Sequence, residues 1–226
     1  MKILKLDEKN YEKAIEETMV FLKADQTIVI PTDTIYGLAC DALNEKAIEK
    51  LLKIKERDRQ KGLPIFVNSV EMARRLSYID KRKEEFLNKI WPGPITVVVH
   101  AKDAVPRIAT GNRETVALRL PDHKFITDLI TAFGKPITGT SANISGNEPI
   151  RSAIEAAEQW KNKKTAPALI IDGGELTNTE PAPLGRGSPT TSGRPSTIID
   201  ITGASPIILR SGIITKKELD HILNRF

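Results

Sequence analysis

Short polar segments follow several apolar runs in this sequence, and the first is PTDTIYG at residues 31–37. It comes directly after the branched apolar residues 28–30 and brings Thr32, Asp33 and Thr34 to that point. In open α/β sheets, ligands bind beyond the carboxyl ends of strands, where hydroxyl groups can donate to or accept from a small polar ligand. Threonine and aspartate also satisfy the backbone of ordinary turns, and this interpretation is favoured when the segment is taken alone.

A second segment, KIKERDRQKGLPIFV at residues 53–67, is rich in cations and begins in the last turn of a predicted helix. Cations are favoured there by the helix dipole, by about 0.3–1 kcal/mol each, so a solvated helix end explains the charges. The alternative is a phosphate site, in which arginine supplies a planar fork and lysine a point charge. Charge alone favours the solvated helix end.

A third segment, TVALRL at residues 115–120, alternates as a strand does. Thr115 and Arg119 share one face, and the apolar residues Val116 and Leu118 share the other. An arginine within a sheet that helices cover is unfavourable unless it is paired or bound to an anion. Arg119 is therefore stronger evidence for an anion site than the lysine-rich segment.

A fourth segment, PITGTSANISGNEP at residues 136–149, places small polar residues and glycine after a predicted strand. Such a turn can cradle an anion through backbone N–H groups, although a plain polar loop has the same composition. The GTSAN part is similar to a hydrolase nucleophile motif, but Asn143 replaces its final glycine. Because no histidine–aspartate partnership is readable, a serine hydrolase is disfavoured.

The common nucleotide and metal motifs are missing from the sequence. It contains neither the G-x-x-x-x-G-K-[ST] loop nor the G-x-G-x-x-G fingerprint. Its three histidines and its single cysteine, Cys40, do not have the spacing of zinc ligands. We therefore predict no protein-bound metal, and any nucleotide would be held without these loops.

Composition and charge are those of an ordinary basic globular protein. The 226 residues are 40% hydrophobic and 28% charged, and the net charge of +5 favours anionic partners such as nucleotides or RNA. One cysteine allows no intrachain disulfide, and the aliphatic runs are too short to cross a bilayer. The start has no signal-peptide pattern, so we expect a cytoplasmic protein that has no membrane partner.

Strands and helices alternate along the predicted chain. Short runs rich in Ile and Val predict strands at residues 3–6, 27–30, 64–67, 95–100, 115–120, 135–139, 168–172, 196–201 and 206–210. Apolar periodicity predicts helices at residues 11–24, 45–56, 69–76, 82–90, 122–133, 151–161 and 215–224, with Asn44 as an N-cap. The strands outnumber the helices, so we expect an α/β domain with a mixed sheet. Residues 173–195, dense in Gly, Pro, Ser and Thr, predict an exposed and flexible excursion with a possible lid role.

The four segments, with three others, resemble the YrdC-like family of threonylcarbamoyl-AMP synthases. The resemblance rests on PTDTIYGLACDA, on Lys55, Arg57 and Lys61, and on WPGPITVVV, VALRLPDH, TSANISG, PSTIID and ILRSG, in this order across residues 10–212. It implies a YrdC-like twisted mixed sheet flanked by helices, in the single-domain form over residues 1–226. Asp33 stands where the family more often has glutamate, and Asp58 and Gly62 stand where it usually has prolines.

The resemblance implies a nucleotidyltransferase that joins L-threonine, bicarbonate and ATP into threonylcarbamoyl-AMP and releases pyrophosphate. The product feeds the t6A modification of tRNA, so RNA and downstream t6A-forming proteins are expected partners. Magnesium is the expected cofactor because it accompanies ATP, but the sequence indicates no protein ligand for it. The alternatives are an RNA-binding module of the same fold without catalysis, and a paralogue that acts on a different substrate.

The resemblance also implies the role of individual residues. Lys55 and Arg57 would be catalytic. The residues expected at L-threonine are Thr34, Asn68, Arg119, Thr140 and Ser196. The residues expected at ATP are Arg57, Lys61, Thr115, Ser141, Asn143 and Arg210.

Overall fold

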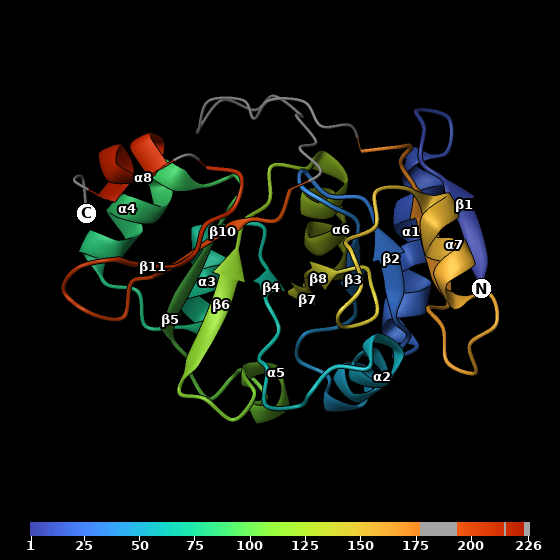
Figure 1. Cartoon of the computed structure of the whole chain (residues 1–226), viewed down its shortest axis with the longest axis horizontal. Helices are drawn as coiled ribbons and strands as arrows, with labels where there is room; N and C mark the ends of the chain where they lie inside the picture. Colours follow the sequence, from blue (N-terminus) through green and yellow to red (C-terminus); the bar gives the residue numbers. More distant parts are fainter. Residues whose placement is uncertain (177–193, 215, 224–226) are drawn as a thin grey trace.

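Two mixed β-sheets make up the framework, and helices pack around them (Figure 1). The structure is a computed structural model, which describes residues 1–176, 194–214 and 216–223. The five-stranded sheet has the order β1 (Lys2–Lys5), β9 (Leu169–Asp172), β2 (Ile28–Ile30), β3 (Gly37–Ala39) and β8 (Thr140–Ser141). The six-stranded sheet has the order β11 (Ile207–Arg210), β10 (Thr197–Asp200), β5 (Ile95–His100), β6 (Thr115–Arg119), β4 (Ile65–Phe66) and β7 (Ile137–Thr138).

The helices bury the apolar faces of both sheets. They are α1 (Tyr11–Lys23), α2 (Glu45–Lys55), α3 (Val70–Leu76), α4 (Lys81–Ile90), α5 (Arg107–Thr110), α6 (Lys124–Phe133), α7 (Ala153–Trp160) and α8 (Lys216–Leu223). One hydrophobic cluster lies where α1 and α6 pack against β2 and β9. A larger cluster contains side chains from both sheets, from Val29 and Leu38 to Val97 and Leu118, so the two sheets share a core.

The predicted mixed α/β class is confirmed, with the strands divided between two sheets. Each predicted strand and helix has a counterpart in the described part of the chain, usually within two residues of its predicted ends. The sequence analysis missed β3, β8 and α5, which are only two to four residues long. Segments this short complete no apolar period, and they form because neighbouring strands supply their partners.

Gly139 is the point at which the chain crosses from one sheet to the other. β7, directly before it, pairs with β4 in the six-stranded sheet, and β8, directly after it, pairs with β3 in the five-stranded sheet. A Cβ atom at this position would overlap the ring of Phe66, so only glycine lets the two strands approach the ring so closely. The crossing is reinforced by the backbone bond from Thr138 N to Cys40 O, at 2.9 Å.

The cation-rich segment at residues 53–67, called the basic segment below, begins in the last turn of α2. The predicted N-cap is confirmed, since the side chain of Asn44 accepts a hydrogen bond from the backbone N–H of Ala47 at 3.1 Å. At the other end Glu56 adopts a left-handed conformation, with φ of 51°, and the helix stops. Lys55 is therefore held in the last helical turn and Arg57 in the loop that follows, so their side chains have different environments.

One prediction concerns a segment that the structure describes only in part. Most of the predicted excursion at 173–195 lies outside the described residues, so its flexibility and lid role stay predictions.

A separate finding concerns membranes. Within the described ranges, no helix has the length and apolar character needed to span a membrane.

Gly111 should be a sensitive position for stability. It ends α5 with φ of +64°, and an added Cβ would lie 2.5 Å from the carbonyl oxygen of Gln60 in the basic segment. We expect Gly111→Ala to lower the free energy of unfolding by about 2–5 kcal/mol, because left-handed strain of about 1–2 kcal/mol adds to an overpacking term of about 1–3 kcal/mol. Chemical denaturation measures this change.

Gly134→Ala is the matched control. Gly134 also ends a helix in the left-handed region, with φ of +73°, but an added Cβ would meet no atom within 4 Å. Only the backbone strain of about 1–2 kcal/mol should then appear. Equal destabilisation by the two variants would show that the contact between α5 and the basic segment is not tight.

Candidate active site

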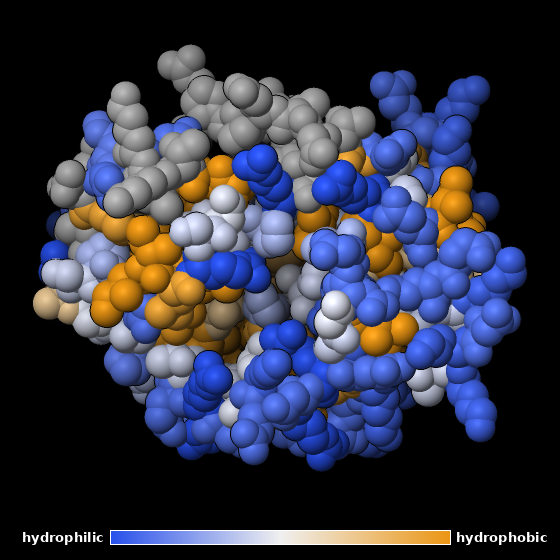
Figure 2. Space-filling model, viewed as in Figure 1, coloured by the Kyte–Doolittle hydropathy of each residue, from blue (hydrophilic) through white to orange (hydrophobic). Residues whose placement is uncertain are grey.

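A pocket of about 500 Å³ opens between the two sheets. Figure 2 shows it as a hollow near the centre of the molecule, with apolar surface on the side of β11 and polar surface opposite. The pocket is within the size range of small-molecule sites. Its wall contains four arginines, namely Arg57, Arg113, Arg119 and Arg210. Such a concentration of guanidinium groups is suited to an anionic ligand.

The turn after β2 forms the wall of the pocket on the side of the five-stranded sheet. The hydroxyl of Thr32 accepts from the backbone N–H groups of Thr34 and Ile35, at 3.0 and 3.2 Å, and donates to the Ile35 carbonyl at 2.7 Å. Thr32 therefore serves the turn, as the simpler interpretation of the sequence predicted. The single hydroxyl proton of Thr32 is donated to the Ile35 carbonyl. In the 3.0 Å contact between the Thr32 and Thr34 hydroxyls, Thr34 is therefore the donor.

Arg119 is paired with Asp33, which belongs to the turn after β2. Its Nη2 lies 2.7 Å from Asp33 Oδ2, and the two side chains are only 4% and 5% exposed. Its Nη1 donates to the hydroxyl of Thr34 at 3.1 Å, and its Nε donates to the carbonyl of Gly93 at 3.0 Å. The sequence predicted that Arg119 needs a partner or an anion, and Asp33, 86 positions away in the sequence, is this partner.

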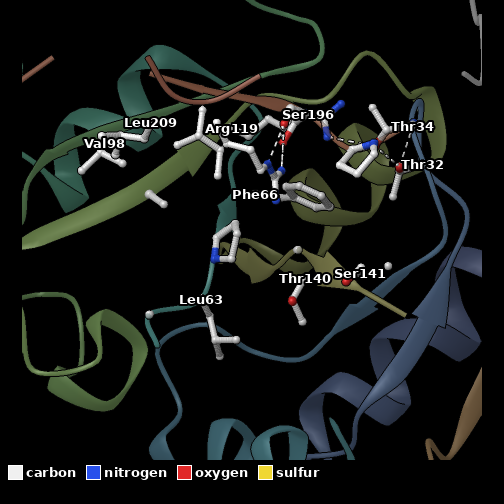
Figure 3. Close-up of a pocket in the computed structure, with 18 of the residues that line it drawn as sticks. Thr32, Thr34, Leu63, Phe66, Val98, Arg119, Thr140, Ser141, Ser196 and Leu209 are labelled. Carbon is white, nitrogen blue, oxygen red and sulfur yellow. Dashed lines mark hydrogen bonds between the residues drawn. The ribbon is translucent and has the colours of Figure 1, made fainter. Parts of the chain in front are cut away.

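The guanidinium of Arg119 is also held from one side by an aromatic ring. Its central carbon lies 5.8 Å from the centre of the Phe66 ring, and Figure 3 shows this ring beside Arg119. The same ring is the one that a Cβ atom added at Gly139 would overlap. Three of its five N–H donors are used by Asp33, Thr34 and Gly93, which leaves two donors without a partner among the described residues. A fixed guanidinium with two free N–H groups at a pocket wall is suited to bind a carboxylate.

Hydrogen bonds join Ser196 and Arg210, which line the pocket together with Arg119. Nε and Nη2 of Arg210 donate to the Ser196 carbonyl at 3.2 and 2.8 Å, and the Ser196 hydroxyl lies 2.9 Å from that of Thr96. Burial, reinforced by the nearby charge of Arg119, lowers the pKa of Arg210. A buried arginine whose charged form is further disfavoured by a neighbouring guanidinium indicates a site prepared for an anion.

Lys55 lies behind the pocket wall and is almost completely buried. Its Nζ donates to the carbonyl of Ser141 at 2.5 Å and to the carbonyl and side-chain oxygens of Asn143, both at 2.9 Å. The Ser141 hydroxyl is a further neighbour at 3.2 Å. Burial, assisted by the positive charge of Arg57, lowers the pKa of Lys55 to about 7. Lys55 therefore fixes the turn after β8 and can change charge near neutral pH.

Arg57 reaches the pocket from the loop that follows α2. Its Nε donates to the Lys61 carbonyl at 3.2 Å and its Nη2 to the Gly62 carbonyl at 2.9 Å. Burial lowers the pKa of Arg57, against the opposing effect of Asp58. The backbone of the basic segment thus orients this guanidinium, and the cations of the segment have distinct roles rather than forming one solvated face.

Comparison with known proteins shows the family of the chain. The Sua5/YciO/YrdC family model, described as "Telomere recombination", matches residues 20–184. The chain belongs to the Sua5/YciO/YrdC family. A curated relative from Pyrococcus abyssi, named threonylcarbamoyl-AMP synthase, is 34% identical over 220 residues, which are 95% of this chain and 60% of that protein.

Shorter relatives with the same name are covered more fully by the chain. The protein from Photorhabdus laumondii is 38% identical, with 66% of this chain and 81% of the relative covered. The protein from Aliivibrio fischeri is 37% identical, with 76% of this chain and 93% of the relative covered. The chain therefore spans most of these two relatives and less than two thirds of the Pyrococcus protein.

Solved structures of the family have the same fold. P. abyssi Sua5 complexed with L-threonine matches with a TM-score of 0.87 and 32% identity, over 100% of this chain and 62% of that one. Escherichia coli YciO matches with a TM-score of 0.77 over 96% of this chain and 97% of that one. At 23% identity, the YciO match shows the fold alone.

Most residues predicted from the family resemblance lie at the pocket. Those in its wall are Thr34, Arg57, Thr115, Arg119, Thr140, Ser141, Ser196 and Arg210. Lys55 and Asn143 lie behind the wall and are linked to it through Ser141. The structure therefore brings together residues from all four of the polar segments, and the role of each stays a prediction.

Two predicted residues lie elsewhere. The side chain of Asn68 donates to the Thr131 hydroxyl on α6 at 2.9 Å and accepts from Ser69, so it is turned away from the pocket wall. Lys61 is exposed and is not part of the pocket wall. Its backbone carbonyl accepts a hydrogen bond from Nε of Arg57. Both positions depend on the packing of a loop, which the residue pattern does not determine.

Other residues at the pocket were not predicted as site residues. Asp33, the partner of Arg119, was noted as part of the polar turn and as a departure from the family but not as a site residue, although the need of Arg119 for a partner was a usable signal. Asp200 and Arg113 also line the pocket, and an apolar floor is formed by Val98, Ile198 and Leu209. Figure 3 shows Val98 and Leu209 together on the side of the pocket away from Thr32 and Thr34.

The low pKa of Lys55 predicts that anion binding is linked to proton uptake. Above pH 7 the free protein holds Lys55 largely neutral, and a bound polyphosphate favours its charged form and raises its pKa. We expect uptake of up to one proton on binding inorganic tripolyphosphate at pH 8, and affinity that falls as pH rises from 7 towards the raised pKa. Calorimetry in two buffers of different ionisation enthalpy measures this uptake.

Lys55→Met is the corresponding test variant. It keeps an unbranched apolar side chain in place of the buried stem and removes the titrating group. Proton uptake at pH 8 should then disappear. The same uptake in wild type and Lys55→Met would contradict the assignment of this titration to Lys55.

Proposed function

We propose that this protein is a threonylcarbamoyl-AMP synthase, a nucleotidyltransferase that uses L-threonine, bicarbonate and ATP and releases pyrophosphate. The observation that carries the proposal is the buried Arg119, which keeps two free N–H donors on a pocket wall beside other arginines. The names of the curated relatives and the L-threonine complex of P. abyssi Sua5 support it.

In this proposal L-threonine binds at the Arg119 end of the pocket. The two free donors of Arg119 match the two oxygens of its carboxylate. The hydroxyl-bearing residues Thr34, Thr140 and Ser196 also line the pocket, where they can bind the amino acid side chain or the carbamate. The amino group is then directed towards the space lined by Ser141 and Arg57.

ATP occupies the remainder of the pocket. Arg57 and Arg210 neutralise the phosphates, and the turn that Lys55 holds through Asn143 supplies Ser141 close to the reacting centre. The base and ribose lie over the apolar floor of Val98, Ile198 and Leu209. Such a division of cationic and apolar surfaces matches the two halves of a nucleotide.

The chemistry needs two steps, and neither requires a covalent link to the protein. The neutral amine of threonine attacks bicarbonate, and loss of water leaves a carbamate. A carbamate oxygen then attacks the α-phosphorus of ATP, and the bond between this phosphorus and the β-bridging oxygen breaks to release pyrophosphate. All partners are anionic, so fixed cations and orientation supply the catalysis, and orientation alone is worth up to about 7–11 kcal/mol in favourable cases.

Magnesium fits this site as a companion of ATP rather than as a protein-held metal. Among the described residues, no group of three or more His, Cys, Asp or Glu side chains is placed to hold a metal. The described residues of the pocket wall supply one carboxylate, that of Asp200. Phosphate oxygens and water would form most of the coordination shell, and the metal would neutralise phosphate charge.

We place the reaction in the cytoplasm, upstream of the proteins that form t6A on tRNA. The alternative of an RNA-binding module without catalysis predicts basic surface interleaved with exposed aromatic rings. Within the described residues, Trp91 and Trp160 are buried, and Tyr78 is the aromatic residue with a largely exposed ring. This surface favours the enzyme over the RNA-binding module.

The decisive assay follows pyrophosphate release from ATP and bicarbonate with and without L-threonine. We expect release to depend strongly on threonine. Arg119→Lys and Arg57→Ala should each lower kcat/KM at least about 100-fold, because two hydrogen bonds to charged groups contribute about 1.5–3 kcal/mol each. Equal release in the absence of the amino acid would overturn the substrate assignment.

Arg59→Ala is the matched control for the basic segment. Arg59 is exposed and pairs with Glu49 at 2.6 Å, away from the pocket wall. It should retain activity within about twofold, because an exposed ion pair contributes less than about 1 kcal/mol. A loss as large as that in Arg57→Ala would show that the segment acts through its total charge.

A further inference from the structure

We infer that Asp200 accepts a hydrogen bond from the 6-amino group of adenine and thereby makes the pocket prefer ATP over GTP. This inference rests on the proposed function, because it assumes that a nucleoside triphosphate occupies the pocket. It assigns a specificity role to a residue that the sequence analysis did not select.

Strand register places Asp200 on the pocket face of the six-stranded sheet. Asp200 pairs with Val98 on β5, and Val98 pairs with Ala117 on β6, so the three residues form one row across the sheet. Arg119 lies two residues further along β6, which separates the two rows by about 7 Å. A ligand held by Arg119 and extended along the pocket therefore reaches the row of Asp200.

Among the described residues of the wall, which include four arginines, Asp200 is the one carboxylate. A carboxylate in this position repels phosphate and lowers the affinity of the adjoining surface for anions. Asp200 is half-buried, and no lysine or arginine of the described chain lies within ion-pair distance of it. Its charge is therefore directed to the pocket rather than neutralised by a protein cation.

One oxygen of Asp200 is used by the protein and the other is not. Oδ1 accepts from the backbone N–H of Thr202 at 2.8 Å and from its hydroxyl at 2.6 Å. Oδ2 has no hydrogen-bond donor among the described residues. The turn after β10 thus fixes the carboxyl group and leaves one strong acceptor for a ligand.

The surroundings of this acceptor indicate which part of the nucleotide it contacts. Val98, Ala117 and Ile198 on the sheet, with the 56%-exposed Leu209 on β11, give a flat apolar surface beside it. Figure 2 shows this apolar surface continuing over β11 at the edge of the hollow. A purine base lying on such a surface presents its edge to Asp200. With the edge at position 6 towards Asp200, adenine presents an amino donor, whereas guanine presents a carbonyl acceptor that Asp200 would repel. The N1–H and 2-amino donors of guanine lie on the adjoining edge, so the preference requires that position 6 faces Asp200.

Asp200→Asn tests the inference with little change in shape. The asparagine oxygen can still accept from Thr202, so the amide nitrogen replaces the free acceptor in the pocket. We expect the ratio of ATP affinity to GTP affinity to fall at least about 10-fold, with weaker ATP binding and stronger GTP binding. Purine riboside triphosphate, which lacks the amino group, should bind the wild type at least about 5-fold more weakly than ATP and bind Asp200→Asn about as well as ATP. These are equilibrium measurements without threonine.

Thr202→Val is the control for a merely structural role. It removes the hydroxyl that donates to Oδ1 and leaves Oδ2 unchanged, so the ATP to GTP ratio should stay within about twofold of wild type. L-threonine affinity and the thermal midpoint should also be unchanged in Asp200→Asn.

Several results would overturn the inference. The first is an unchanged ratio of ATP affinity to GTP affinity in Asp200→Asn. The second is a change in this ratio that higher magnesium concentration removes. The third is weaker binding of 2′-deoxy-ATP than of ATP to the wild type, with no such difference in Asp200→Asn. The last two results would assign Asp200 to the metal or to the ribose. Absence of threonine-dependent pyrophosphate release in the wild type would instead contradict the proposed function, while the binding ratios would still test Asp200.

Discussion

The buried ion pair between Asp33 and Arg119 is the interaction on which the pocket depends. Asp33 belongs to the turn after β2 of the five-stranded sheet, and Arg119 ends β6 of the six-stranded sheet. Burying two charges is unfavourable unless they are paired, and breaking such a pair by removing one partner costs about 3–5 kcal/mol. The pair can therefore form only when the two sheets meet in one relative position. It fixes the guanidinium that the proposed reaction needs for threonine.

The rest of the site is built outwards from this pair by contacts that also have structural roles. Gly139 brings the chain from one sheet to the other and packs against Phe66, whose ring supports the guanidinium of Arg119. Lys55 fastens the turn after β8 through Ser141 and Asn143. Because the same bonds join the sheets and orient the polar groups, the pocket is preorganised for its ligand. Little reorganisation is then needed when the ligand binds.

The sequence predicted the framework well because long apolar patterns determine it. The strand at 95–100 and the helix at 45–56, for example, follow from Ile and Val runs and from apolar periodicity. β3 and β8 could not be predicted in this way, because each has two or three residues and exists only through its neighbours. Among the site residues, the need of Arg119 for a partner was visible, but its identity depends on a contact between residues 86 positions apart. The contact of Asn68 was not visible for a similar reason, since its side chain donates to a hydroxyl that α6 supplies.

A crystal structure of the protein with bound L-threonine tests the central claim most directly. The account predicts that the threonine carboxylate lies on the two free N–H donors of Arg119, while Asp33 Oδ2 keeps its contact with Nη2 near 2.7 Å. It also predicts that Thr34 and Gly93 remain the other acceptors of this guanidinium. A carboxylate that displaces Asp33 from Arg119, or that binds Arg57 or Arg210 instead, would contradict it.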